Sequence, residues 1–282
     1  EAEAWEDFLD MTISQAILWA ATNIFPEEEK SEIAAAEPYF IGSHSGASGA
    51  WVSGPKDLAP AEYFWGADNM TTVKGLFAAG DASGASSHKF SSGSHAEGRI
   101  AGKAMVRWIV NEKPELGSDY SAAETLKAEV FKPLETYYEN VGKTTRDDVN
   151  PHFIRSNQFR MRLQKLMDEY VGGVSAQFAT SKYNLEKGKK LMTFLREDAV
   201  HLGAKDLHEL MRCWENTHRM YQAWSHMLAI DFREETRWPG YYFRSDTPKM
   251  DDENWHVFVN LTMNPESEEW SFEKVPVQHM EW

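Results

Sequence analysis

The stretch that most constrains the fold is VKGLFAAGDASGASSHKFSSGSHAEGRIAGK, at residues 73–103. Its apolar first part, Val73 to Ala79, predicts a short buried strand, and Gly80-Asp81 predicts a turn directly after it. A loop of small residues follows, and the apolar spacing after Ser94 predicts a helix. The expected apolar face of this helix contains Ile100, Ala101, Ala104, Met105, Trp108 and Ile109.

A strand end, an aspartate and a helix N-terminus brought together by glycines suit a ligand with hydroxyl groups and negative charge. Asp81 can accept hydrogen bonds from ribityl-type hydroxyls, and free N–H groups at a helix start favour an anion or an electron-rich ring edge. An ordinary crossover without a ligand stays open, because short glycine motifs are weakly specific. Ser94 also fits a plain N-cap.

Four segments carry a resemblance to a known family. GLFAAGDASG resembles the second flavin-contacting motif, G-L-[YF]-A-A-G-[ED], of the fumarate reductase and succinate dehydrogenase flavoprotein superfamily. PYFIGSHSGASGAWVSGP (residues 38–55), SSHKFSSGSHAEGRIAGKA and the C-terminal RWPGYYFRSDTPKMDDENWHVFVN resemble one branch of it, the alpha subunits of dissimilatory adenylylsulfate reductases. The similarity covers essentially the whole chain, and HKFSSGS separates this branch from its dicarboxylate-using relatives.

The resemblance implies an α/β plus α fold: the C-terminal part of a Rossmann-like FAD-binding domain, then a helical bundle and an extended segment. The implied domains are the end of a capping domain (1–37), the return segment of the FAD-binding domain (38–112), a helical domain (113–232) and the extended C-terminal segment (233–282). The chain contains no G-x-G-x-x-G fingerprint. We therefore expect a C-terminal fragment that by itself binds no FAD stably and is inactive.

The implied function is that of an oxidoreductase acting on a sulfur group of donors. It would interconvert adenosine 5′-phosphosulfate with sulfite and AMP in dissimilatory sulfur metabolism, through a flavin N5–sulfite adduct on FAD. Electrons would come from a beta subunit that carries two [4Fe–4S] clusters, with docking to a membrane electron-donor complex as an open possibility.

The resemblance also implies roles for individual residues. His44 falls where the superfamily has the histidine of H-Y-x-M-G-G, which touches the substrate beside the flavin, so it is the candidate catalytic and substrate-binding residue. His88 and Lys89 replace an Asn-Arg pair whose arginine clamps a carboxylate. Lysine cannot reproduce that bidentate fork, which favours phosphate or sulfate as ligand and leaves open whether His88 or Lys89 faces it.

The cofactor-binding candidates surround the glycine turn. Asp81, next to Gly80, is the candidate for the ribityl chain of the flavin. The helix-start group is expected near the pyrimidine side of the ring, where N–H donors stabilise the negative charge that reduction builds. This group consists of Ser91, Ser92, Gly93 and Ser94. His95 and Glu97 are expected in the first helical turn.

The remaining chain is predicted to be largely helical. An amphipathic helix within residues 1–25 is expected to end at Pro26, and Pro114, Gly117 and Pro133 are expected to separate short helices. Three further helices are predicted by apolar spacing. Their markers are Phe159 to Tyr170 with a stop at Gly172-Gly173, Leu191 to Leu195, and Leu207 to Ile230. Asp251-Asp252 predicts a helix start before Trp255 rather than a metal pair.

Composition and charge exclude several other classes. The formal net charge of −15 argues against a nucleic-acid partner, and no apolar run approaches the roughly 20 residues of a membrane span. Cys213 is the only cysteine, so the chain has neither an internal disulfide nor the ligands of a zinc or iron–sulfur site. Together with the resemblance, this predicts a cytoplasmic protein. No metal site is expected from the spacing of the helical histidines His201, His208, His218 and His226.

Two other functions stay open at the level of sequence. The first is fumarate reductase or L-aspartate oxidase chemistry, which Lys89 and the lack of H-Y-x-M-G-G disfavour. The second is a non-catalytic helical scaffold, which would contain no flavin.

Overall fold

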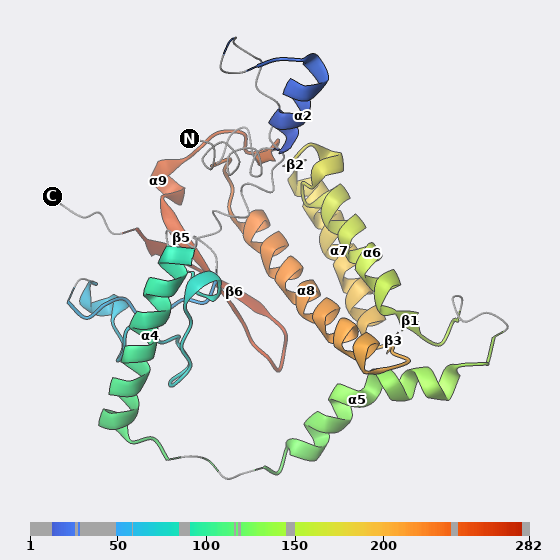
Figure 1. Cartoon of the computed structure of the whole chain (residues 1–282), viewed down its shortest axis with the longest axis horizontal. Helices are drawn as coiled ribbons and strands as arrows, with labels where there is room; N and C mark the ends of the chain where they lie inside the picture. The colour runs from blue at the N-terminus through green and yellow to red at the C-terminus, as the bar shows by residue number, and fades with distance from the viewer. Residues whose placement is uncertain are drawn as a thin grey trace. The chain divides into compact units, whose positions relative to one another are not determined.

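The computed structural model describes residues 13–25, 28, 49–57, 59–84, 91–115, 117, 120–144, 150–237 and 242–277. The chain divides into two compact units, Glu1–Leu116 and Gly117–Trp282. Both helices and strands are present, although helices dominate (Figure 1). Within the described ranges, none of the helices has both the length and the apolar character that a bilayer crossing requires.

The described part of the first unit contains two α-helices and two short 3-10 turns. They are α2 (Ile13–Thr22), η2 (Ala61–Tyr63), η3 (Gly80–Ala82) and α4 (Ser91–Glu112). The predicted N-terminal helix is thus confirmed over residues 13–22, and residues 1–12 lie outside the described part. In the described residues from 49 to 83, isolated bridges join segments of the chain. These bridges are Ala50 with Ser83, Val52 with Thr71, and Met70 with Phe77.

The prediction of a buried strand over residues 73–79 is wrong. Val73 is 60% exposed and Leu76 is 55% exposed. Residues 71–76 instead form a tight turn, in which the Leu76 N–H donates to the Val73 carbonyl (3.0 Å) and the Thr71 N–H donates to the Leu76 carbonyl (2.8 Å). Gly75, with φ of +86°, supplies a backbone conformation that a strand does not contain.

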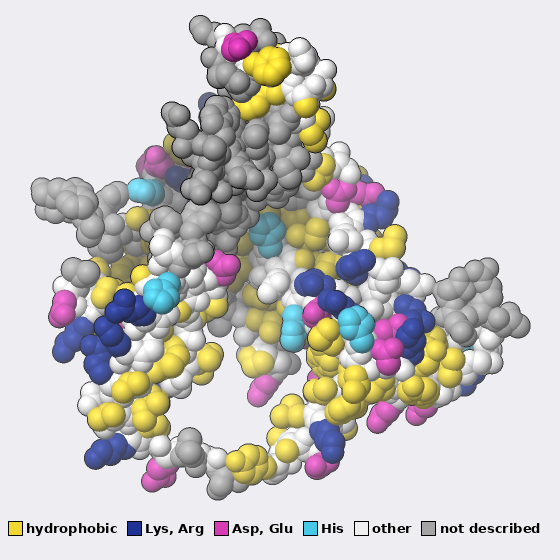
Figure 2. Space-filling model, in the orientation of Figure 1, with side chains coloured by type: hydrophobic (Ala, Val, Ile, Leu, Met, Phe, Trp, Pro, Cys, Tyr) yellow, Lys and Arg dark blue, Asp and Glu magenta, His cyan; other side chains and the backbone are white. Residues whose placement is uncertain are grey.

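Helix α4 begins at Ser91, three residues before the predicted start. Its buried stripe is narrower than predicted, because Ala101 and Ala104 are buried whereas Ile100 and Ile109 are 44% and 54% exposed. Ala104 packs with Ala67 and Met70, and Trp108 covers this small cluster. Figure 2 shows hydrophobic side chains gathered on the surface of α4 and, in the second unit, on that of α5 (Ala123–Asn140).

The second unit is built on three long helices that pack side by side (Figure 1). They are α6 (Ser156–Tyr170), α7 (Lys182–Ala199) and α8 (Leu207–Phe232), with the short turn η4 (Val174–Ala176) after α6. All three were predicted, and α6 stops before Gly172, whose φ is +84°. Fully burying each large apolar side chain contributes about 1.5–3 kcal/mol. The shared core contains Phe159, Leu163, Leu166, Leu185, Met192, Leu195, Leu210, Cys213, Met220 and Met227.

Helix α5 (Ala123–Asn140) overturns the prediction that Pro133 separates two helices, since Pro133 lies inside it. Proline lacks an N–H and its ring disturbs the preceding turn, so the helix bends instead of ending (Figure 1). Two nearby carbonyls accept hydrogen bonds from outside the helix. Val130 accepts from Trp214 Nε1 (2.9 Å), and Pro133 accepts from the Ala204 N–H (2.9 Å).

Among its described residues, the second unit also contains three small sheets. β1 (Ile154–Arg155) pairs in parallel with β3 (Leu202–Gly203), and β2 (Ala179–Thr180) pairs in parallel with β4 (Phe243–Arg244). β5 (Val257–Met263) and β6 (Trp270–Pro276) form an antiparallel hairpin in which Val257 lies opposite Pro276. The hairpin packs on α8 through aromatic rings: Phe232 stacks on Phe272 with centroids 4.6 Å apart, and Trp224 meets Trp270 at 5.5 Å.

The helix start predicted at Asp251-Asp252 is confirmed as α9 (Asp252–Trp255). Asp251 is its N-cap and accepts a hydrogen bond from the Asn254 N–H (3.1 Å). Trp255 is buried, and Lys274 Nζ lies 3.4 Å from the centroid of its ring. The acidic pair therefore has a structural role at a helix start.

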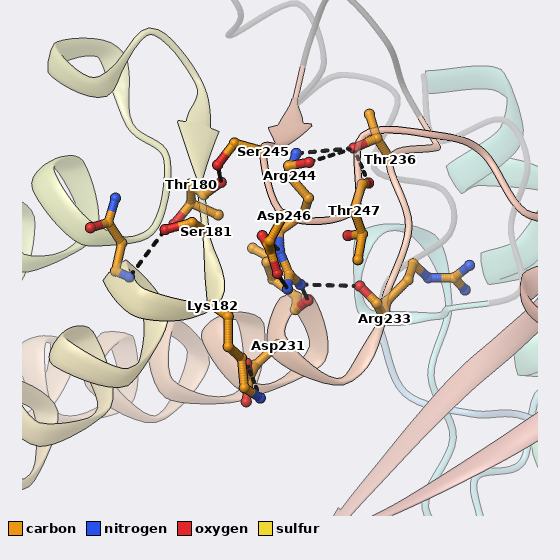
Figure 3. A network of polar contacts seen from close by, with 12 residues as sticks. Thr180, Ser181, Lys182, Asp231, Arg233, Thr236, Arg244, Ser245, Asp246 and Thr247 are labelled. Atoms are coloured by element: carbon orange, nitrogen blue, oxygen red, sulfur yellow. Dashed lines mark hydrogen bonds and ion pairs between the residues drawn. The ribbon is translucent and has the colours of Figure 1, made fainter.

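A buried arginine ties β4 to the end of α8 (Figure 3). The Arg244 side chain is 2% exposed and donates to Asp246 through both Nε (3.0 Å) and Nη2 (2.6 Å). Its Nη1 donates to the carbonyls of Ile230 and Arg233, the last at 3.1 Å. Thr236 Oγ1 accepts from the Arg244 N–H (3.0 Å) and donates to the Thr247 carbonyl (2.9 Å).

Candidate functional site

The candidate site is the turn η3 and the helix α4 that follows it. Gly80 is buried with φ of +61°, a backbone conformation that residues other than glycine rarely adopt. A Cβ atom at Gly80 would lie 3.3 Å from Ser94 Oγ and 3.4 Å from Ser94 Cβ. Glycine thus allows the turn and the first part of α4 to approach closely. The structure brings Gly80 and Ser94 together, although the strand expected before them is absent.

Hydrogen bonds fix the turn on both sides. The Gly80 N–H donates to Glu97 Oε2 on α4 (2.7 Å), and the Ser83 N–H donates to the Gly80 carbonyl (3.0 Å). Before the turn, the Ala78 N–H donates to the Asn69 carbonyl (3.0 Å), and Asn69 Nδ2 donates to the Ala78 carbonyl (3.1 Å). The backbone around Gly80 is therefore held from α4 and from the preceding loop.

The glycine-rich segment from residue 49 runs against the chain just after the turn. The Ala50 N–H donates to the Ala82 carbonyl (2.8 Å), and the Gly84 N–H donates to the Ala50 carbonyl (2.9 Å). Gly49 has φ of +148°, and a Cβ there would lie 2.6 Å from the Ser83 carbonyl carbon. Glycine is required for this close approach. The segment that follows His44 in sequence is thus joined to the segment that follows Asp81.

The structure describes some of the predicted site residues and not others. Asp81 and Ser92 are exposed, and Gly93 and Ser94 are half-buried. Because α4 begins at Ser91, Ser94 lies within its first turn, and the alternative role of Ser94 as N-cap is wrong. The other candidates, His44, His88, Lys89 and the Ser91 side chain, lie outside the described residues.

Glu97 is the residue whose role sequence reasoning missed. It was expected in the first helical turn, but it lies in the second turn and points its carboxylate at the Gly80 N–H. Ser94 and Glu97 are three residues apart, a spacing that places both on one helix face. That spacing is the signal in the sequence that could have paired Glu97 with Ser94 and the turn.

Other groups with chemical potential lie in the second unit. Burial raises the pKa of the Cys213 thiol to about 12, so this cysteine stays protonated and is a core residue. A hollow of about 590 Å³ lies between α5, α7 and α8, but none of the predicted site residues lines it. Across the described ranges, no three His, Cys, Asp or Glu residues gather as a metal site would require.

Comparisons with known proteins give a consistent result. Residues 160–282 match the family described as the fumarate reductase flavoprotein C-terminal region. The chain is 50% identical to the alpha subunit of adenylylsulfate reductase from Megalodesulfovibrio gigas, over 98% of this chain and 42% of that protein. It is 52% identical to the solved adenylylsulfate reductase of Archaeoglobus fulgidus, with a TM-score of 0.88, over 100% of this chain and 44% of that one.

Two further solved structures show how similar the fold is at high and at low sequence identity. A structure of adenosine-5-phosphosulfate reductase with covalently bound sulfite matches with 52% identity and a TM-score of 0.88, again over 100% of this chain and 44% of that one. A quinol–fumarate reductase of E. coli matches with 18% identity and a TM-score of 0.57, over 75% of this chain and 35% of that one. The chain thus spans less than half the length of these relatives. It belongs to the fumarate reductase and succinate dehydrogenase flavoprotein superfamily, on the branch of the adenylylsulfate reductase alpha subunits.

Proposed function

We propose that the full-length protein interconverts adenosine 5′-phosphosulfate with sulfite and AMP, as the FAD-dependent alpha subunit of an adenylylsulfate reductase. The observation that carries this proposal is 52% identity, over the whole of this chain, to a reductase whose structure contains a covalent sulfite adduct. Because the chain spans 44% of that relative, the activity is proposed for the full-length protein. The 282-residue chain alone is expected to be inactive and to bind no FAD stably.

The Gly80 turn fits a flavin cofactor. Because the buried Gly80 has no side chain, the backbone of the turn lies directly against the first part of α4. When bound, FAD supplies the electron transfer and the ring atom that takes up sulfur. In this proposal Gly80 and Asp81 bind the ribityl chain. The N–H groups of residues 91–94 lie at the N-terminal end of α4, where they favour the negative charge of a reduced ring.

The proposed substrate residues are His44, His88 and Lys89. A histidine near neutral pH can carry a positive charge or donate a proton, both of which suit an anionic sulfonyl group. Lysine offers a point charge instead of the fork with which arginine clamps a carboxylate, so Lys89 favours a phosphate or sulfate group.

The proposed partner is an iron–sulfur beta subunit with two [4Fe–4S] clusters. Such a cluster takes four cysteine ligands, and this chain has one cysteine, which is buried. In this proposal the electrons for the FAD arrive from that beta subunit, and docking to a membrane electron-donor complex is an open possibility. A cytoplasmic location and the domain assignment 1–37, 38–112, 113–232 and 233–282 complete the proposal.

The test uses the full-length protein in its oxidised form. Sulfite is expected to change the visible absorbance of the bound flavin, and subsequent AMP is expected to produce reduced flavin together with adenosine 5′-phosphosulfate. A flavin absorbance that sulfite leaves unchanged would contradict the proposal. A protein purified without any flavin would instead favour a non-catalytic scaffold.

A substitution at His44 tests its proposed role. His44→Ala in the full-length protein is expected to lower the rate by about 10²- to 10⁴-fold, the usual contribution of a general acid or base. The FAD content should stay at the wild-type level, because the residue is assigned to substrate and not to cofactor. Wild-type turnover in this variant would remove His44 from the site.

In the unmutated full-length protein, turnover of fumarate or succinate without a response to adenosine 5′-phosphosulfate would favour the dicarboxylate alternative.

A further inference from the structure

We propose that Glu97 is a positioning residue for the cofactor site, which holds the turn Gly80–Ala82 in the conformation that receives FAD. The inference rests on the proposed function, because it assumes that FAD binds at this turn. Its starting point is the hydrogen bond from the Gly80 N–H to Glu97 Oε2, which measures 2.7 Å and joins residues 17 positions apart.

Helix α4 contacts Gly80 through two residues on the same face. Ser94 lies where a side chain at Gly80 would point, with its Oγ 3.3 Å and its Cβ 3.4 Å from the position of a Cβ atom. Glu97, one helical turn further along, reaches the N–H of the same glycine. One residue therefore limits how closely the turn can approach α4, and the other holds the turn against α4.

This turn needs such a tether because of its backbone. Glycine has more backbone freedom than any other residue, and it has no side chain whose packing could hold its conformation. The buried Gly80, at φ +61°, must therefore be held through its backbone. Removing the Glu97 carboxylate would also leave the buried Gly80 N–H without this acceptor, and a buried unpaired donor is unfavourable. The turn is then expected to relax away from α4.

A relaxed turn would show directly in cofactor affinity. The apparent affinity of a ligand falls in proportion to the fraction of protein in the binding-competent conformation. Loss of a hydrogen bond to a charged group corresponds to about 10- to 100-fold in an equilibrium constant. We therefore expect Glu97→Ala to weaken FAD binding by about that factor, even though the assigned cofactor contacts remain.

What the turn requires is an oxygen acceptor at the correct reach. Glutamine keeps a carbonyl oxygen at the same distance from the backbone and removes the charge. Aspartate keeps the charge but is one methylene shorter, so its carboxylate does not reach the Gly80 N–H equally well. Positioning thus predicts that Glu97→Gln, which keeps a neutral hydrogen bond, binds FAD more tightly than Glu97→Ala and within about 10-fold of wild type, whereas Glu97→Asp is weakened in the same direction as Glu97→Ala.

The experiment titrates FAD into the flavin-free, full-length protein and follows flavin fluorescence, with thermal unfolding of the flavin-free protein measured alongside. Glu112→Ala is the matched control, since Glu112 lies on the same helix, is 52% exposed and pairs only loosely with Lys74 at 3.8 Å. Its FAD affinity should equal that of wild type. Should Glu97→Ala fail to fold, the comparison of the Gln and Asp variants still decides the question.

Two outcomes would overturn the role of Glu97. One is wild-type FAD affinity in Glu97→Ala or in Glu97→Asp. The other is a Glu97→Gln protein that binds FAD as weakly as Glu97→Ala, because the charge and not the acceptor would then matter. A wild-type protein that takes up no FAD would instead refute the proposed function, so the two failures can be told apart.

Discussion

Replacing Arg244 by methionine tests the buried network at the end of α8 most directly. Methionine retains an apolar stem, but it removes the hydrogen bonds to Asp246, Ile230 and Arg233 that the guanidinium makes. Breaking a buried ion pair by removing one partner lowers the free energy of unfolding by about 3–5 kcal/mol. The lower part of this range applies, because the Asp246 side chain is 30% exposed and water can replace part of the lost contact.

The assay is thermal unfolding followed by far-ultraviolet circular dichroism, which reports the helices. For a unit of about 150–250 residues, each kcal/mol shifts the midpoint by about 2–4 °C, so the loss of about 3–4 kcal/mol in Arg244→Met should lower it by about 6–16 °C. Arg162→Met is the matched control. Arg162 is 53% exposed in its ion pair with Asp198, and exposed pairs contribute about 0–1 kcal/mol. Equal shifts in the two variants would refute the reasoning.

The same pair predicts a pH dependence. The hydrogen bond from Arg244 keeps the pKa of Asp246 below its ordinary value in the folded protein. The contribution of the Arg244–Asp246 pair to stability is thus fully present above the ordinary aspartate pKa of about 3.9. It is lost as the pH falls through the lower pKa that Asp246 has in the folded protein. The difference in midpoint between wild type and Arg244→Met should therefore be largest near neutral pH and shrink in acid. A difference that grows on acidification would contradict this assignment.

Further variants test other parts of the second unit. Leu185→Ala removes a fully buried side chain and should lower the free energy of unfolding by about 2–5 kcal/mol in urea titration, whereas Leu207→Ala, at a 68% exposed position, should change it by less than about 1 kcal/mol. Asp206→Ala removes the N-cap that accepts from the Glu209 N–H at 2.9 Å, and it should destabilise α8 near neutral pH. The Glu209 N–H holds the pKa of Asp206 below its ordinary range, so this difference should fade on acidification. An Asp206→Ala protein that unfolds like wild type at neutral pH would show that the cap is dispensable.

Sequence reasoning succeeded where a pattern is local. The apolar spacing of α6, α7 and α8 is long and regular, so these helices could be predicted, and Gly172 marked the end of α6 correctly. The start of α9 could be predicted for the same reason, because Asp251 caps a helix whose sequence lies directly after it.

The errors came from features that depend on distant residues or on single backbone angles. The apolar run at residues 73–79 resembles a strand, but Gly75 at φ +86° turns the chain back and leaves Val73 exposed. Pro133 was expected to separate two helices, yet hydrogen bonds from Trp214 on α8 and from Ala204, directly after β3, support the bend in α5. At the candidate site, the pairing of Gly80 with Ser94 followed from the glycine motif. The contact of Glu97 with the Gly80 N–H was missed, although its three-residue spacing from Ser94 places both residues on one face of α4.

The contacts of the Arg244 side chain also affect the order in which parts of the chain can fold during synthesis. The Ile230 carbonyl that it contacts is made 14 residues earlier, so the carboxyl end of α8 emerges before its partner exists. The buried residues of the three-helix core all precede Arg244, and Met227 is the last of them. This core can therefore form before Arg244 has been synthesised, because folding during synthesis starts from the N-terminal part. The contacts of Arg244 then stabilise the end of α8 only after the core has formed. Chains released before residue 246 would keep the three-helix core but lack the Arg244–Asp246 ion pair.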